Sequence, residues 1–123
     1  MMRAAFSILA AALAGCAIGT IVPNERHTVR KHPLPPFELH EDCVRMQPGD
    51  RLEYRFQATA RVNFDIHFHE GKVVVAPITR EQVEADRGTF EPLDAHEYCL
   101  TWEARLPNTL VDYEVMLVRP AKR

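Results

Sequence analysis

The sequence predicts an all-β protein, an antiparallel β-sandwich built from two packed sheets of short strands. Apolar and polar residues alternate over residues 51–60 and again over 61–69, with the period of a strand that buries one face. Turn signals such as Gln-Pro-Gly-Asp at 47–50 separate these runs, and no amphipathic helix of useful length is present. One-sided alternation favours antiparallel sheets that pack face to face.

Residues 1–15 have the pattern of a signal peptide. A positive start at Arg3 precedes an apolar run of about ten residues, which is too short to span a bilayer. The tetrapeptide Leu-Ala-Gly-Cys that ends at Cys16 is similar to a bacterial lipobox, which predicts cleavage before Cys16 and lipidation of that cysteine. The alternative is an ordinary secretory signal followed by a chance cysteine.

Lipidation of Cys16 would hold the protein at a membrane surface, because more than one buried acyl chain makes anchoring stable. Ala17, rather than aspartate, follows the cysteine. By resemblance to enterobacterial lipoproteins, this favours the outer membrane of the bacterial cell envelope, with the protein facing the periplasm. Residues 16–36 are rich in proline, which predicts a semi-rigid tether in which His27 and His32 are solvated.

Residues 37–123 are expected to form the folded domain. In chain order, strands are expected at Phe37–Leu39, Cys43–Met46, 51–60, 61–69, 72–78, 97–106 and 110–118. Residues 79–96 are polar and irregular, with at most a helical turn that Gly88 ends. The expected core side chains of the two alternating runs are Leu52, Tyr54, Phe56, Ala58, Val62, Phe64, Ile66 and Phe68.

Two cysteines remain once the lipobox has taken Cys16. Cys43 and Cys99 form an even pair in a chain that is exported to an oxidising compartment, which predicts a disulfide. In the chain-entropy model this bond contributes about 4 kcal/mol. A catalytic or redox thiol is the alternative, although no Cys-x-x-Cys pattern supports it.

The motifs of the domain resemble the GOLD (Golgi-dynamics) family. The stretch that starts at Cys43 with "CVRMQPGDRLEYRF", continues through "NFDIHFHEG" and ends with "EYCLTWEA" has a similar order of a cysteine strand, a turn, alternating strands and a final aromatic-Cys-aliphatic strand. The resemblance covers residues 36–118. It implies a β-sandwich with paired cysteines that binds proteins or lipids and is not an enzyme.

A polar row on the strand at 61–69 carries candidate metal ligands. His67 and His69 project from the same face of a strand, an arrangement that supplies two ligands to zinc or copper sites. Asp65 lies on the same row and His96 precedes the Cys99 strand, while Glu70 and His40 are further candidates. The main alternative is an exposed or half-buried polar strand face, and a further alternative is a surface that recognises a protein, a glycan or a lipid headgroup.

No catalytic function is expected. The one serine, Ser7, lies in the signal peptide, and the carboxylates are scattered without a spacing that indicates acid–base chemistry. The net charge of -2 provides no basic surface for nucleic acid. The sequence therefore favours a non-catalytic, membrane-anchored binding module of the cell envelope, with an envelope protein, glycan or lipid as partner. The alternative is a periplasmic lipoprotein that binds zinc or copper.

Overall fold

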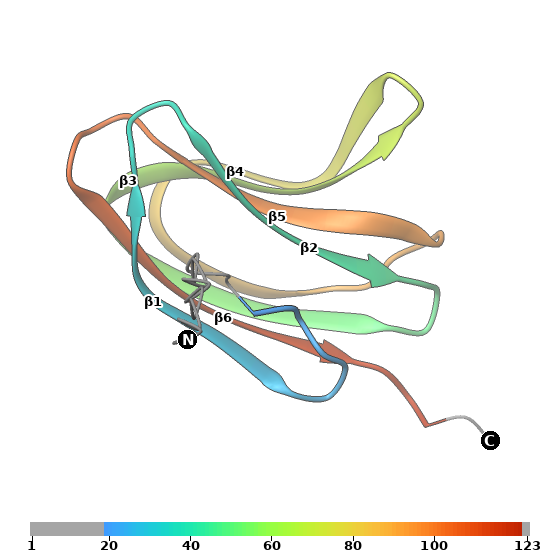
Figure 1. The fold of residues 1–123 in the computed structure, drawn as a ribbon. Coiled ribbons are helices and arrows are strands. Elements are labelled where there is room, and N and C mark those ends of the chain that lie inside the picture. The colour runs from blue at the N-terminus through green and yellow to red at the C-terminus, as the bar shows by residue number, and fades with distance from the viewer. Residues whose placement is uncertain (1–18, 122–123) are drawn as a thin grey trace, which may run out of the picture.

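The computed structural model describes residues 19–121, and every regular element in this range is a β-strand (Figure 1). All the strand pairings are antiparallel, so the expected all-β antiparallel class is confirmed. Within residues 19–121 there is no helix that could cross a bilayer. The strands are β1 (Arg26–Leu34), β2 (Leu39–Met46), β3 (Arg51–Glu70), β4 (Val73–Phe90), β5 (His96–Ala104) and β6 (Thr109–Val118).

Strand β3 organises the sheet, because it pairs with three other strands. One edge of β3 carries β4. The other edge pairs with β6 over residues 51–58 and with β5 over residues 62–67. The sheet therefore divides into a β6 arm (β1, β6 and the first half of β3) and a β5 arm (β2, β5 and the second half of β3).

The two arms curl toward each other and enclose the core (Figure 1). Trp102 of β5 stacks on Tyr113 of β6 with 4.3 Å between ring centroids, so the inner faces of the arms are in contact. The six strands nevertheless form one hydrogen-bonded sheet in the order β1-β6-β3-β5-β2, with β4 beside β3, and two separate sheets are not confirmed.

The expected core positions of β3 are confirmed with one difference. Leu52, Tyr54, Phe56, Ala58, Val62, Phe64 and Ile66 are buried, whereas Phe68 is partly buried. The residues between them on residues 51–57 are exposed, as the alternation predicts.

The expectation of two strands at 51–60 and 61–69 was wrong, because β3 continues through both. The even-numbered positions stay on the inner face from Leu52 to Ile66. The pairing of β4 with β3 shifts in register between Gln57 and Val62 and again between Val62 and Phe64, and at this second shift Gln82 takes a positive φ of 50°. The backbone and side-chain amides of Gln82 both donate to Asn63 Oδ1 at 3.0 Å. Similarly, the two short strands expected at 37–46 are one strand, β2.

Residues 79–96 were expected to be irregular, but most of them belong to β4. Phe90 pairs with Leu52 and Val83 with Val62, so the strand follows β3 along nearly its whole length. Only one edge of β4 is paired, and most of its side chains remain exposed. An edge strand of this kind does not need apolar alternation, which explains why the pattern resembles a loop.

The proline-rich segment expected as a tether over residues 16–36 contains β1, which is a correction. β1 pairs with β6, and Leu34 and the preceding Ile21 are buried. Pro33 lies near the end of this edge strand, a position at which a missing N–H is tolerated. Just before β1, the side chain of Asn24 forms two hydrogen bonds with the main chain of Arg119, both at 3.1 Å, and so holds this part of the chain against the end of β6. Residues 1–18, with the signal peptide and Cys16, lie outside the described range.

Candidate functional site

His67 and His69, two of the histidines predicted as metal ligands, lie on the outer face of the β5 arm, but in different environments. His67 is only 5% exposed, whereas His69 is exposed. Their rings meet edge to face with 5.2 Å between centroids. His67 and His69 therefore share a face of β3, as the alternation predicts, but only the side chain of His69 is exposed to solvent.

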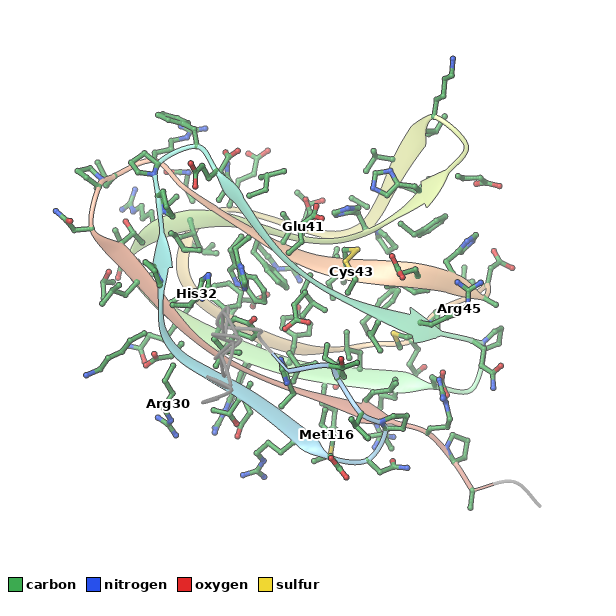
Figure 2. The ribbon with its side chains drawn as sticks, viewed as in Figure 1. Arg30, His32, Glu41, Cys43, Arg45 and Met116 are labelled. Carbon is green, nitrogen blue, oxygen red and sulfur yellow. A yellow bond between two sulfur atoms is a disulfide. The ribbon has the colours of Figure 1, made fainter. Side chains whose placement is uncertain are left out.

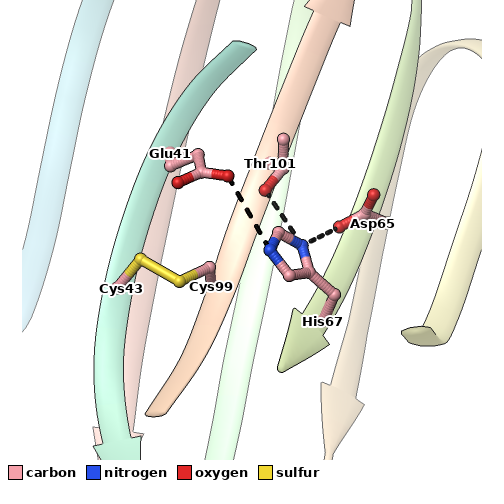
Figure 3. Close-up of a disulfide and its surroundings, with 6 residues drawn as sticks. All are labelled: Glu41, Cys43, Asp65, His67, Cys99 and Thr101. Carbon is pink, nitrogen blue, oxygen red and sulfur yellow. Dashed lines mark hydrogen bonds and ion pairs between the residues drawn. A yellow bond between two sulfur atoms is a disulfide. The ribbon is translucent and has the colours of Figure 1, made fainter. Parts of the chain in front are cut away.

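Two carboxylates flank the ring of His67 (Figure 3). Nδ1–H donates to Asp65 Oδ1 at 2.6 Å, and Thr101 Oγ1 lies 3.3 Å from the same nitrogen. On the other side of the ring, Nε2 lies 3.7 Å from Glu41 Oε1. Asp65 thus fixes the orientation of the ring and leaves Nε2 facing Glu41.

The structure does not bring His96 to this face. The His96 ring stacks on Phe68 with 4.0 Å between centroids and meets Tyr98 edge to face. Phe68 and His67 are consecutive on β3, and consecutive side chains of a strand point to opposite faces. His40, the further candidate, lies on the inner face and bonds Tyr113. The predicted set of Asp65, His67, His69 and His96 is therefore divided between two faces.

The predicted disulfide between Cys43 and Cys99 is confirmed. Cys43 of β2 lies directly opposite Cys99 of β5, with 4.0 Å between Cα atoms. His67 of β3 is the register partner of Cys99 on its other side, so the disulfide and the imidazole occupy one row across three strands (Figure 3). Within residues 19–121, the one group of three or more His, Cys, Asp or Glu side chains whose ligand atoms converge is Glu41, Cys43 and Cys99.

A chain of buried polar groups joins the two ends of the sheet. Strands β1 and β2 stand at opposite ends of the strand order, yet His27 Nε2 of β1 lies 2.8 Å from Asp42 Oδ2 of β2. Tyr113 Oη also donates to Asp42 Oδ2 at 2.9 Å and accepts from His40 Nε2–H at 2.9 Å. We call His27, His32, His40, Asp42 and Tyr113 the seam cluster.

Burial shifts the pKa values of His40 and Tyr113 in the seam cluster. It lowers the pKa of His40 to about 4, with a further lowering from His32 and an opposing effect of Asp42. Burial also raises the pKa of Tyr113, and the neighbouring Asp42 raises it further. His40 is therefore neutral at neutral pH, with the proton on the Nε2 that donates to Tyr113. The cluster closes the open side of the curled sheet.

The sequence contained a signal for part of this cluster. His40 and Asp42 have the same parity on β2 as the apolar Val44 and Met46, which are buried. His27 and His32 could not be placed, because their segment was expected to be a tether.

A groove crosses the outer face of β1, β6, β3 and the second half of β4. Its volume is about 530 Å³. A second hollow of about 520 Å³ continues it and shares Arg55, Arg87 and Glu114. The exposed lining of the first hollow is more apolar than polar, whereas that of the second is mainly polar. Figure 2 shows Arg30 and Met116 directed away from the β5 arm. We call this feature the arginine groove.

Arginines reach the arginine groove from three strands. Arg26 and Arg30 come from β1, Arg55 from β3 and Arg87 from β4. Glu114 of β6 lies between them at 19% exposure and forms ion pairs with Arg26 at 3.2 Å and with Arg55. Among residues 19–121, no ion pair engages Arg30 or Arg87, so their guanidinium groups remain available to a ligand.

Sequence reasoning placed Arg51, Glu53, Arg55 and Gln57 on an outward row but did not identify the groove. The groove depends on the register of β3 with β6 and β4, which sets Arg55 beside both Glu114 and Arg87. No local sequence signal specifies this pairing.

Comparisons with known proteins found likenesses among solved structures alone. No protein-family model matches the chain, and no curated protein matches it. Among solved structures, the chain is similar to a de novo designed double-stranded β-helix determined by solution NMR. That similarity has a TM-score of 0.39 and 19% identity, and it covers 76% of this chain and 97% of the designed chain.

Proposed function

We propose that the protein is a non-catalytic binding module of the bacterial cell envelope that takes an anionic ligand in the arginine groove. The supporting observation is the gathering of four arginines in the lining of the two hollows, where Arg26 and Arg55 pair with the half-buried Glu114. Arg30 and Arg87 form no ion pair within residues 19–121, although the carboxylates of Glu53, Asp86 and Asp112 also belong to the lining. Guanidinium groups bind carboxylate and phosphate in a bidentate manner. The ligand class is an envelope polymer that carries carboxylate or phosphate groups.

The arrangement of the groove supports binding rather than catalysis. Thr28, Gln57 and Thr89 add hydrogen-bonding groups to the arginines, and the open shape suits an extended chain that crosses the strands. The two cysteines of the domain are joined to each other on the other arm. This reading keeps the GOLD-like interpretation of residues 37–123 as a sandwich-type module that binds without chemistry.

The proposal includes a lipid anchor at Cys16 that holds the domain at the outer membrane, facing the periplasm. The support is the lipobox-like Leu-Ala-Gly-Cys and the Ala17 that follows it. Mass spectrometry of the protein purified from bacterial membranes is expected to find acyl chains on Cys16. In a variant whose residues 1–16 are exchanged for an ordinary cleavable secretory signal, the protein should move to the soluble periplasmic fraction. Retention of this variant in the membrane would contradict the anchor.

The groove is tested with the full-length Cys16→Ser chain, an oligogalacturonate as carboxylate probe and an inorganic polyphosphate as phosphate probe. Calorimetry is expected to detect binding of at least one probe, weakened by added salt because the contacts are charged. Charge-assisted hydrogen bonds contribute about 1.5–3 kcal/mol each. An Arg55→Ala/Arg87→Ala variant should therefore bind at least tenfold more weakly.

Arg105→Ala is the matched control, because Arg105 is exposed in the turn between β5 and β6, away from the groove. It should bind as tightly as the parent chain. Equal losses in the control and in the double variant would show a non-specific charge effect and would contradict the proposed site.

A further inference from the structure

We propose that the two sulfur atoms of the disulfide belong to a latent metal site. After reduction, Zn²⁺ binds to Cys43, Cys99, Glu41 and His67. This inference does not depend on the arginine groove, which lies on the other arm. It also differs from the predicted set of Asp65, His67, His69 and His96, since it retains only His67 as a ligand.

The ligand atoms already lie close together. One oxygen of Glu41 and the sulfur atoms of Cys43 and Cys99 are all within 4.8 Å of one another. His67 Nε2 lies 3.7 Å from Glu41 Oε1, but His67 is outside the group whose atoms all lie within 4.8 Å of one another. Zinc bonds of about 2.0–2.3 Å in a tetrahedron place ligand atoms roughly 3.3–3.8 Å apart. Closing the site therefore requires the side chains of His67 and of the two reduced cysteines to rotate toward one another.

Three adjacent strands hold the ligands in register. Glu41 and Cys43 lie on β2 with Cys99 opposite on β5, and His67 of β3 pairs with Cys99 on the far side. The backbone of these strands belongs to the ladder of the sheet, so the positions of the ligands do not depend on a loop (Figure 3).

His67 is prepared as a metal ligand by Asp65. Nδ1–H donates to Asp65 Oδ1 at 2.6 Å, which leaves the Nε2 lone pair directed toward Glu41. Carboxylate–histidine–zinc arrangements use this contact to fix the tautomer and orientation of the ligating ring. The ring is 5% exposed, so the geometry is also fixed by packing.

Reduction by a dithiol supplies the missing ligands. The S–S bond breaks, two electrons and two protons pass from the dithiol, and Cys43 and Cys99 become thiols while the reductant becomes a disulfide. Zinc then replaces the two thiol protons, which pass to water, and two zinc–sulfur bonds form. In the oxidised protein only Glu41 and His67 remain as donors at this position, so binding there is weak.

The test uses the full-length Cys16→Ser chain, so that no third thiol is present. The protein is reduced, freed of reductant without oxygen and titrated with Co²⁺, which reports tetrahedral thiolate ligation by its absorption, and then with Zn²⁺. Reduced protein is expected to bind Zn²⁺ at least a hundredfold more tightly than oxidised protein. His67→Ala and Glu41→Gln should each weaken binding at least tenfold, whereas His69→Ala should not.

Two results would overturn the proposal. One is equal zinc affinity of the reduced and oxidised proteins, and the other is a cobalt spectrum without thiolate charge transfer. If reduction unfolds the domain, zinc should restore the β-sheet circular dichroism of the parent chain but not that of His67→Ala, because ligand binding then drives folding. Failure of zinc to refold the reduced parent chain would equally contradict the site.

Discussion

At the scale of single residues, Asp42 shows how the fold accommodates polar groups in its interior. The carboxylate is buried at 8% exposure, and both His27 and Tyr113 donate to the same oxygen. A buried carboxylate without such donors would be costly. Tyr113 also links Asp42 to His40, so one phenol connects β2 with β6.

Replacing Tyr113 with phenylalanine removes this link but keeps the ring that stacks on Trp102. Asp42 then loses a buried donor, so we expect the free energy of unfolding to fall by about 1–3 kcal/mol in urea denaturation. Arg105→Ala, an exposed turn position, should leave the urea midpoint unchanged. An unchanged midpoint in Tyr113→Phe would show that Asp42 does not depend on the phenol.

Stability should depend on pH through His40. Its pKa is about 4 in the folded protein and 6.5 in the unfolded chain, so between these values only the unfolded chain binds the proton. The stabilisation is therefore complete above pH 6.5 and is lost as pH falls toward 4. Burial also lowers the pKa of His32, whose ring lies against that of His40, so this residue contributes in the same direction.

Urea midpoints measured between pH 7 and pH 4.5 test this dependence. The midpoint is expected to fall with pH in the parent chain and to fall less in His40→Gln, while His69→Ala, an exposed position, should follow the parent. A parent midpoint that rises on acidification would contradict the assigned direction.

At the scale of elements, the predictions succeeded where a strand buries one full face. The final two strands, at 97–106 and 110–118, match β5 and β6 closely because their apolar residues alternate into the core. The strand expected at 72–78 is confirmed as the first part of β4, whereas the predictions missed the rest of β4 and all of β1. Both are edge strands. An edge strand receives its hydrogen bonds from one neighbour and exposes most side chains, so its sequence lacks the usual period.

Leu34 tests whether β1 belongs to the domain. Its side chain is 1% exposed at the end of β1, so Leu34→Ala should lower the free energy of unfolding by about 2–5 kcal/mol. Pro36→Ala, an exposed position two residues later, is the control. If residues 16–36 were a solvated tether, both substitutions would be neutral.

The disulfide ties β2 to β5 across a sequence separation of 56 residues. In the chain-entropy model its removal in a Cys43→Ala/Cys99→Ala variant costs about 4 kcal/mol, measured by urea denaturation. A thiol assay of the exported, unreduced protein should detect no thiol at either position. A reactive thiol at one of them would contradict the bond.

At the scale of the whole molecule, the sheet presents two outer faces with different chemistry. The β5 arm carries the disulfide and His67, and the β6 arm with β4 carries the arginine groove. The sequence predicted the first face in part, because two cysteines in an exported chain indicate a disulfide and the alternation of residues 61–69 places His67 on the outer face. The groove could not be predicted, because it combines ordinary arginines from three strands whose register depends on the complete sheet.

The central claim, that the arginine groove binds an anionic ligand, is tested most directly by amide chemical-shift mapping of the full-length Cys16→Ser chain with oligogalacturonate and with polyphosphate. The account predicts shifts that concentrate at Arg30, Arg55, Arg87 and Glu114 for at least one probe. Shifts confined to the β5 arm, or none at millimolar probe, would contradict it.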